Sequence, residues 1–341
     1  MARLRSCRLG LAAAVALLLT ACQAAPPDRS TDVTRLAEMI RQIPGVRAVN
    51  SEVSNEPARG LVYFSLHVET APEITANQLA AVTARYLQAL RMVDYTGYRS
   101  ELVAQEGRNR FTIDRGALPV TNGQQIISQA RDWVALRRQY PTAVIKLRAT
   151  IVHPSGQLPV QEWGHSNIGS IRLDDTSNYS DVATATTLLA TRFPELTTLT
   201  WDVNAGAHHP AGITTSGRFP TSQELDIWRH VNTDQSIAHV DKMTINGRVA
   251  APVWVAEETR SHDPAAAATL AQRHLPLMRG LPTPVLYTSS DQIQGHMTGN
   301  GRSTGPIAIT VGGCTDRDYS AYLPPPVEQQ LMDTYETCGH P

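Results

Sequence analysis

Apolar side chains recur every three to four residues in several segments of the chain, which is the periodicity of an amphipathic α-helix. These segments cover residues 32–42, 75–92, 123–140, 181–193, 222–231 and 265–279. We expect a helix at each of them.

Between these segments apolar and polar residues alternate, a pattern typical of a half-buried β-strand. Strands are predicted for residues 47–54, 60–70, 98–105, 110–113, 142–153, 170–173, 196–203, 237–245, 248–258, 284–288 and 307–311. The dipeptide Asn246-Gly247 lies between two of these runs, and Asn-Gly is a preferred sequence for a tight hairpin turn.

The order of these elements repeats along the chain. Helices begin near residues 32, 123 and 222, and second helices near 75, 181 and 264, so the pattern α-β-β-α-β recurs about every 90 to 100 residues. This order predicts the α+β class, built from tandem ferredoxin-like (split βαβ) modules with mainly antiparallel sheets. The expected modules span residues 32–115, 120–205 and 220–313, followed by a C-terminal tail, 314–341.

The first module carries a further pattern. Ile43-Pro44-Gly45-Val46 separates a helix from a hairpin and a second helix. In this respect the module resembles small bacterial envelope modules of the BON type. The resemblance implies a location in the cell envelope and no particular activity.

The N-terminal sequence is typical of an export signal. Residues 1–8 are basic, residues 9–19 are apolar, and the run ends in Leu19-Thr20-Ala21-Cys22, which resembles the lipobox of bacterial lipoproteins. The resemblance implies that residues 1–21 are a signal peptide, that Cys22 receives a diacylglycerol, and that residues 22–31 are a tether. The protein would then be lipid-anchored on the extracytoplasmic face of the cell membrane. The alternative is an ordinary secretory leader followed by an unpaired cysteine.

Two cysteines remain in the mature chain, because Cys7 leaves with the leader and Cys22 is the lipid acceptor. Export favours a disulfide between Cys314 and Cys338. It would close a loop of about 25 residues and stabilise the tail by roughly 3 kcal/mol. A metal site completed by His340 is the alternative, but the cysteines lack the paired spacing of zinc sites.

Composition narrows the range of partners. The chain has 341 residues, 42% of them hydrophobic, and only Lys146 and Lys242 among its 30 basic residues are lysines. This arginine bias resembles proteins of GC-rich bacteria such as actinobacteria. Without Arg3, Arg5 and Arg8 of the leader, 27 basic residues face 31 acidic ones, a net charge of about −4 that argues against nucleic acid as a partner.

Two glycine-flanked segments invite a catalytic or anion-binding interpretation. Ser166 lies between Gly164 and Gly169, which resembles the nucleophile elbow of α/β hydrolases, but the second glycine is displaced and no helix is expected to follow. We expect a polar hairpin loop. Residues 298–305 are glycine-rich but lack the P-loop lysine, so we expect a surface loop there.

His208, His209 and Asp202 are the candidates for a catalytic or metal site, since imidazole and carboxylate groups bind metal and transfer protons. Other candidate acids are the pairs Asp174-Asp175 and Glu257-Glu258. Neighbouring imidazoles point apart on an extended chain, so a solvated loop is the favoured interpretation. No metal and no cofactor is expected. The tryptophans are expected to fill cores beneath the helices: Trp133, Trp163, Trp201, Trp228 and Trp254.

These observations predict a noncatalytic binding or scaffold lipoprotein of the cell envelope, whose modules contact another envelope protein or a wall polymer. Two alternatives stay open: an extracytoplasmic hydrolase or metal-dependent enzyme, and a carrier of an apolar ligand. A flat face would favour the binding protein, a polar cleft with converging His and Asp side chains the enzyme, and a deep apolar cavity the carrier.

Overall fold

The computed structural model describes residues 25–116, 122–149, 168–261, 263–291, 301–303 and 307–338. The leader, Cys22, Trp163 and Ser166 lie outside these residues. Within them, no helix is both long enough and apolar enough to cross a membrane.

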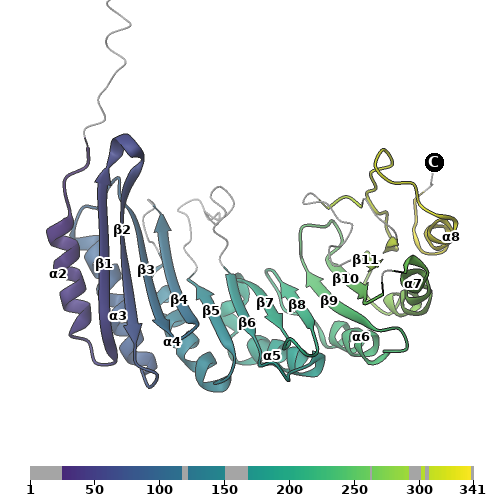
Figure 1. Ribbon diagram of the computed structural model, residues 1–341, viewed down its shortest axis with the longest axis horizontal. Helices are drawn as coiled ribbons and strands as arrows, with labels where there is room; N and C mark the ends of the chain where they lie inside the picture. Colours follow the sequence, from purple (N-terminus) through teal and green to yellow (C-terminus); the bar gives the residue numbers. More distant parts are fainter. Residues whose placement is uncertain are drawn as a thin grey trace, which may run out of the picture.

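All strands of the described chain belong to one sheet of 12 strands, and their order in the sheet follows their order in the sequence (Figure 1). They are β1 (Val46–Glu56), β2 (Leu61–Thr70), β3 (Arg99–Glu106), β4 (Asn109–Gly116), β5 (Val144–Arg148), β6 (Ile168–Arg172), β7 (Thr200–Asn204), β8 (Ala211–Thr215), β9 (His239–Ile245), β10 (Val253–Thr259), β11 (Val285–Ser290) and β12 (Ala308–Val311).

The helices alternate with pairs of strands. They are α2 (Ser30–Arg41), α3 (Ala76–Met92), α4 (Gly123–Gln139), α5 (Tyr179–Arg192), α6 (Ser222–Thr233), α7 (Pro264–Met278) and α8 (Pro326–Tyr335), with short 3₁₀ turns η1 (Pro57–Arg59) and η2 (Pro194–Thr198). Each helix from α2 to α7 is therefore followed by two strands.

This αββ unit explains the pairing of the strands. The two strands of one unit form an antiparallel hairpin, as in β1–β2, β3–β4 and β9–β10. Strands joined through a helix are parallel, as in β2–β3 across α3 and β10–β11 across α7. Crossovers of this kind are nearly always right-handed, so a succession of them places the helices on the same face of the sheet.

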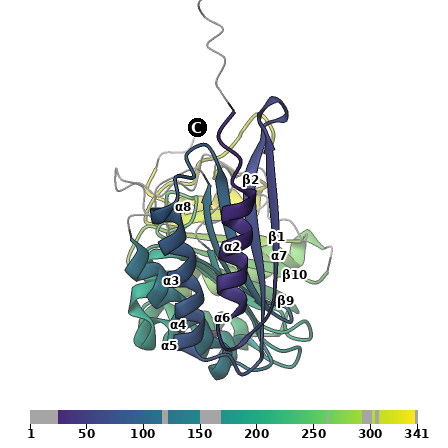
Figure 2. The same ribbon diagram turned by 90° about the vertical axis from the view of Figure 1, so that its left-hand side faces the viewer.

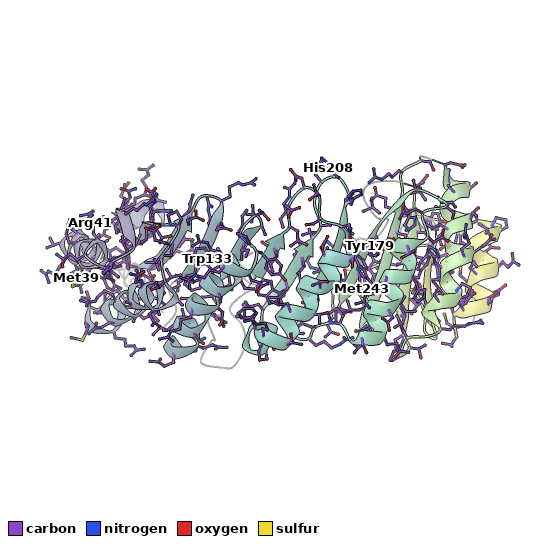
Figure 3. All side chains as sticks on the ribbon, turned by 90° about the horizontal axis from the view of Figure 1, so that it is seen from below. Met39, Arg41, Trp133, Tyr179, His208 and Met243 are labelled. Atoms are coloured by element: carbon purple, nitrogen blue, oxygen red, sulfur yellow. The ribbon has the colours of Figure 1, made fainter. Side chains whose placement is uncertain are left out.

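Figures 1 and 2 show this single layer of helices, and Figure 3 views the molecule from the helical side. Contacts join α2 to α3, α3 to α4, α5 to α6, α6 to α7, and α7 to α8. Between the helices and the sheet lies the core, where Trp133, Trp201 and Trp228 are completely buried. The opposite face of the sheet carries no helix in the described part of the chain.

Local sequence sets the helix boundaries. Thr75 and Gln78 begin α3 with a reciprocal capping box, and Asn178 with Asp181 and Thr221 with Glu224 do the same for α5 and α6. Gly45, in the Pro-Gly turn before β1, has a φ of 86°, a backbone conformation that other residues rarely adopt.

The mixed helix-and-strand architecture predicted from the sequence is confirmed, and the tail contains one further short helix, α8. The finer prediction of ferredoxin-like modules is not confirmed. The first predicted module contains two αββ units, α2 to β4, and its last strand pairs with β5 of the next. The repeat of 90 to 100 residues thus corresponds to two structural units, and pairs between units are parallel rather than antiparallel.

Three local predictions were wrong. Residues 211–215, where no strand was predicted, form β8, because a five-residue strand with glycine at its second position carries little periodicity. The strand predicted at 196–203 divides into η2 and β7. Trp254 is only partly buried and lies on the helix-free face, where its indole N–H donates to Thr288 Oγ1 at 2.9 Å.

Candidate functional site

The helix-free face of the sheet is largely polar. One row of directly opposed residues crosses eight strands, from β3 to β10: Gln105, Arg110, Lys146, Ser170, Asp202, Thr214, Thr244 and Trp254. On the other side of the same strands, Phe111, Ile145, Trp201 and Val255 face the helices and are buried. The alternation of the strands therefore separates an apolar core from a polar face.

Positive charge concentrates where β4, β5 and β6 meet on this face. Arg110 is directly opposite Lys146, and Arg172 follows on β6; all three side chains are exposed. None of them forms an ion pair within the described residues, whereas neighbouring Arg148 pairs with Asp114 at 3.3 Å. Like charges opposite each other on paired strands are destabilising. We call Arg110, Lys146 and Arg172 the basic patch.

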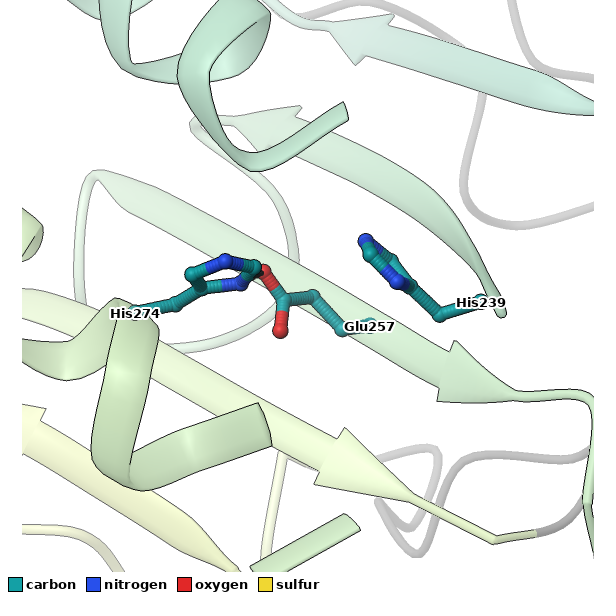
Figure 4. Close-up of side chains that lie close together, drawn as sticks. All are labelled: His239, Glu257 and His274. Carbon is teal, nitrogen blue, oxygen red and sulfur yellow. Dashed lines mark hydrogen bonds and ion pairs between the residues drawn. The ribbon is translucent and has the colours of Figure 1, made fainter. Parts of the chain in front are cut away.

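A second polar group lies on the helical side, buried between α7 and the sheet. Figure 4 shows His239 at the start of β9, Glu257 on β10 and His274 on α7. His274 Nδ1 lies 2.7 Å from Glu257 Oε1, and the side chains of all three residues are almost completely shielded from solvent. One ligand atom from each residue lies within 4.8 Å of the other two.

Further groups surround these three residues. His274 Nε2 lies 3.3 Å from Asp234 Oδ2, and the Tyr287 hydroxyl donates to Glu257. His239 Nε2 lies 3.3 Å from Asp241 Oδ2, and Asp241 is 1% exposed. We call His239, Asp241, Glu257 and His274 the His–carboxylate cluster.

Burial and charge act against each other in this cluster. Burial lowers the pKa of His239, but the nearby Asp241 carboxylate outweighs burial and raises it to about 9. Burial raises the pKa of both the Asp241 and the Glu257 carboxyl. The ionisable groups of the cluster lose hydration on burial, and their charged forms are stable only where a close partner offsets this loss.

A surface pocket of about 250 Å³ reaches the cluster through His239. Residues from the start of α5, the segment before β8, the end of α6 and the segment after β10 also line it, among them Tyr179, His209, Asn232 and Arg260. His209 is exposed and His239 is 4% exposed, so the pocket connects solvent with a buried imidazole.

No protein-family model matches this chain, and neither does any curated protein or solved structure. Function must therefore be inferred from the chemistry of its own residues.

The residues of the cluster interrupt an apolar alternation. In β9, the inward positions are His239, Asp241, Met243 and Ile245, so two polar residues occupy core positions of the strand. Glu257 was among the candidate acids, but sequence reasoning missed His239, Asp241 and His274. The available signal was a polar residue at an inward position of an alternating strand.

The sequence candidates His208, His209 and Asp202 do not form one site. Asp202 lies on the helix-free face, where it accepts from Thr214 at 3.0 Å and lies 3.9 Å from Lys242 Nζ. His208 is exposed, and His209 lines the pocket. In the described part of the chain, the group able to hold a metal contains none of these three residues.

The glycine-flanked segments have structural explanations where they are described. A Cβ at Gly169 would lie 2.6 Å from the Trp201 ring, so glycine makes room for the indole. In the glycine-rich loop, Arg302 contacts the tail through Asp316 at 3.3 Å. Residues 164–167, which include Ser166, and residues 298–300 and 304–305 lie outside the described chain.

Cys314 and Cys338 are unbonded thiols in the structure. Backbone hydrogen bonds join the segments that carry them, from Gly312 to Tyr335 and from Thr337 to Gly313, each at 3.0 Å. Burial and a hydrogen bond with Cys314 raise the pKa of the Cys338 thiol. The disulfide remains a prediction.

Proposed function

We propose that this protein is an exported, lipid-anchored and noncatalytic binding protein of the cell envelope, which holds an anionic partner on the helix-free face of its sheet. The basic patch is the observation that carries this proposal. Exposed positive charges that have no ion-pair partner among the described residues, held at fixed positions on a sheet, attract negatively charged groups.

The chemistry of the face favours a polar and extended partner. The row from Gln105 to Trp254 offers amide, hydroxyl, cationic and aromatic side chains at the spacing of adjacent strands, about 4.8 Å. A wall polymer bearing phosphate or carboxylate groups fits this surface, and so does an acidic segment of an envelope protein. A net charge of about −4 for the mature chain disfavours nucleic acid.

Two further statements belong to this proposal. The lipobox-like sequence ending at Cys22 supports anchoring to the membrane, and residues 22–31 supply a tether that holds the sheet near its surface. The proposal also keeps three modules, each of which consists of two consecutive αββ units.

Binding tests the basic patch. The double variant Arg110→Gln, Lys146→Gln is compared with the unmodified chain and with the control Lys242→Gln. Lys242 is the only other lysine of the sequence, and it lies on the same face beside Asp202. In cosedimentation with an anionic wall polymer, the double variant should lose at least tenfold in affinity and the control less than about twofold. Equal binding by all three proteins would refute the assignment of the face.

Detergent partitioning tests the anchor independently. The unmodified protein should enter the detergent phase, and Cys22→Ala should remain in the aqueous phase. A Cys22→Ala protein that still partitions with detergent would contradict lipidation.

A further inference from the structure

We propose that the His–carboxylate cluster is a binding site for a divalent transition-metal ion, with Zn²⁺ as the best fit. His239, Asp241, Glu257 and His274 would supply two imidazole nitrogens and two carboxylate oxygens. This proposal is independent of the basic patch, which lies on the opposite face of the sheet.

Three of the four proposed ligand atoms lie at spacings that a tetrahedral site can accommodate. The ligand atoms of His239, Glu257 and His274 lie within 4.8 Å of one another. Zn–N and Zn–O bonds of 2.0 to 2.2 Å place tetrahedral ligand atoms about 3.4 Å apart. Side-chain movements of about 1 Å would therefore close the three ligands around an ion.

Both imidazoles are held by a second contact at the nitrogen that would not bind the metal. His239 Nδ1 lies 2.6 Å from the Ile237 carbonyl oxygen, while Nε2 lies 3.3 Å from Asp241 Oδ2 and 3.2 Å from the Val231 carbonyl oxygen, a contact that the ion would replace. His274 Nε2 lies 3.3 Å from Asp234 Oδ2, which leaves Nδ1 on the side of Glu257. Outer contacts of this kind fix the tautomer and orientation of metal-binding histidines.

Asp241 provides a separate observation. It is 1% exposed, yet neither of its carboxylate oxygens accepts a hydrogen bond of good geometry from the described residues. Its nearest cationic neighbour is His239, at 3.3 Å. A buried carboxylate without hydrogen bonds is strongly unfavourable, and a metal ion beside His239 would compensate it directly.

The ligand set distinguishes between metals. Two carboxylates balance the charge of a divalent ion once both imidazoles are neutral. Mixed imidazole and carboxylate ligands suit zinc and its neighbours in the first transition row, whereas calcium and magnesium prefer all-oxygen sites. The ion has a route from solvent, because His239 lines the pocket and the Asp234 side chain is 25% exposed.

Competition with a chromophoric chelator measures Zn²⁺ binding to the full chain, purified in detergent and stripped of metal, at pH 8. We expect one equivalent to bind. Glu257→Gln and His274→Gln should each weaken binding at least tenfold.

Matched controls exist for both variants. Glu258→Gln alters the next residue of β10, which faces away from the cluster, and His230→Gln removes an exposed histidine of α6. Both should bind within about twofold of the unmodified chain. Absence of saturable Zn²⁺ binding by the unmodified chain would overturn the proposal, as would undiminished binding by Glu257→Gln and His274→Gln.

Cobalt substitution gives a readout on the unmodified chain. Co²⁺ bound to the unmodified chain should give the visible bands of a tetrahedral nitrogen and oxygen site, without thiolate charge-transfer bands. The double variant Cys314→Ser, Cys338→Ser should give the same spectrum. Thiolate bands, or loss of the spectrum in that double variant, would place the ion at the cysteines and refute the site.

Discussion

The two ends of the sheet are built from the same αββ unit but bury different chemistry. At the N-terminal end, Val49, Phe64, Leu66 and Val68 of β1 and β2 are buried under α2 and α3, and the buried polar residues nearby, such as Thr70, carry no charge. At the C-terminal end, the inward positions of β9 to β11 include three members of the His–carboxylate cluster, together with Tyr287 and Ser289, and α7 supplies the fourth member, His274.

This difference shows that the fold does not require the buried charges. Uncharged side chains fill the core of the N-terminal units, where apolar burial contributes about 25 cal/mol per Å² of surface removed from water. Buried ionisable groups lose their hydration, and only specific charged or hydrogen-bonding partners offset this loss. Such groups therefore seldom improve stability over an apolar core. Their concentration at one end of a repeating structure indicates a role other than packing.

A second buried ion pair holds the C-terminal tail. Arg317 binds the Glu336 carboxylate through both terminal nitrogens, at 2.9 and 2.8 Å, and its Nε lies 3.6 Å from Glu328. Because Glu328 and Glu336 lie within and just after α8, this contact fixes the last helix beside β12. The C-terminal end therefore depends on electrostatic contacts in two places.

The largest predicted effect follows from removing Arg317. Arg317→Ala leaves two buried carboxylates without their cation and should destabilise the protein by about 3–5 kcal/mol. Urea unfolding at pH 7 measures the loss. The control Arg229→Ala removes an exposed i,i+3 pair and should change stability by less than about 0.5 kcal/mol. Equal effects of the two variants would contradict the contrast.

Truncating the N-terminal core should have a somewhat smaller effect that does not depend on pH. Leu66→Ala removes a fully buried side chain and should destabilise the protein by about 3 kcal/mol, since a cavity remains. Leu61→Ala, on a partly exposed side chain of the same strand, should have little effect. Unfolding at pH 5 and pH 8 should give the same loss for Leu66→Ala; a loss that varied with pH would show that the N-terminal core is coupled to ionisation.

Acid should weaken the C-terminal end. Burial raises the pKa of Glu336, but hydrogen bonds from Arg317, Thr315 and the Thr310 backbone outweigh it and leave the pKa lowered. The stabilisation is therefore complete above the ordinary value of 4.5 and is lost as the pH falls through the lower, folded-state value.

Urea unfolding between pH 6 and pH 3 should show this loss, and Glu336→Gln should flatten the curve. Glu38→Gln, which alters an exposed residue of α2, should leave the slope unchanged. A slope that Glu336→Gln does not alter would assign the acid sensitivity to other carboxylates.

The sequence predicted the helices well because amphipathic periodicity is local and extends over many residues. It also predicted the Asn246 hairpin, where Asn246 has a φ of 49°. The continuous sheet was missed because parallel pairing between units, such as β4 with β5, joins residues far apart in the sequence and leaves no short-range pattern.

The candidate site was harder to predict for the same reason. His239, Glu257 and His274 come from three elements, and only the parallel and antiparallel pairing of β9 to β11 under α7 brings them together. His208 and His209 drew attention because they are adjacent in sequence, yet only His209 reaches the pocket. The basic patch likewise depends on the register of β4, β5 and β6.

Anomalous X-ray diffraction at the zinc absorption edge, on crystals of the protein grown with Zn²⁺, tests the contrast between the two ends most directly. We predict one strong anomalous peak at the C-terminal end, about 2.0–2.2 Å from ligand atoms of His239, Glu257 and His274. A cluster without a peak, while zinc binds elsewhere on the chain, would show that these buried charges serve the fold alone.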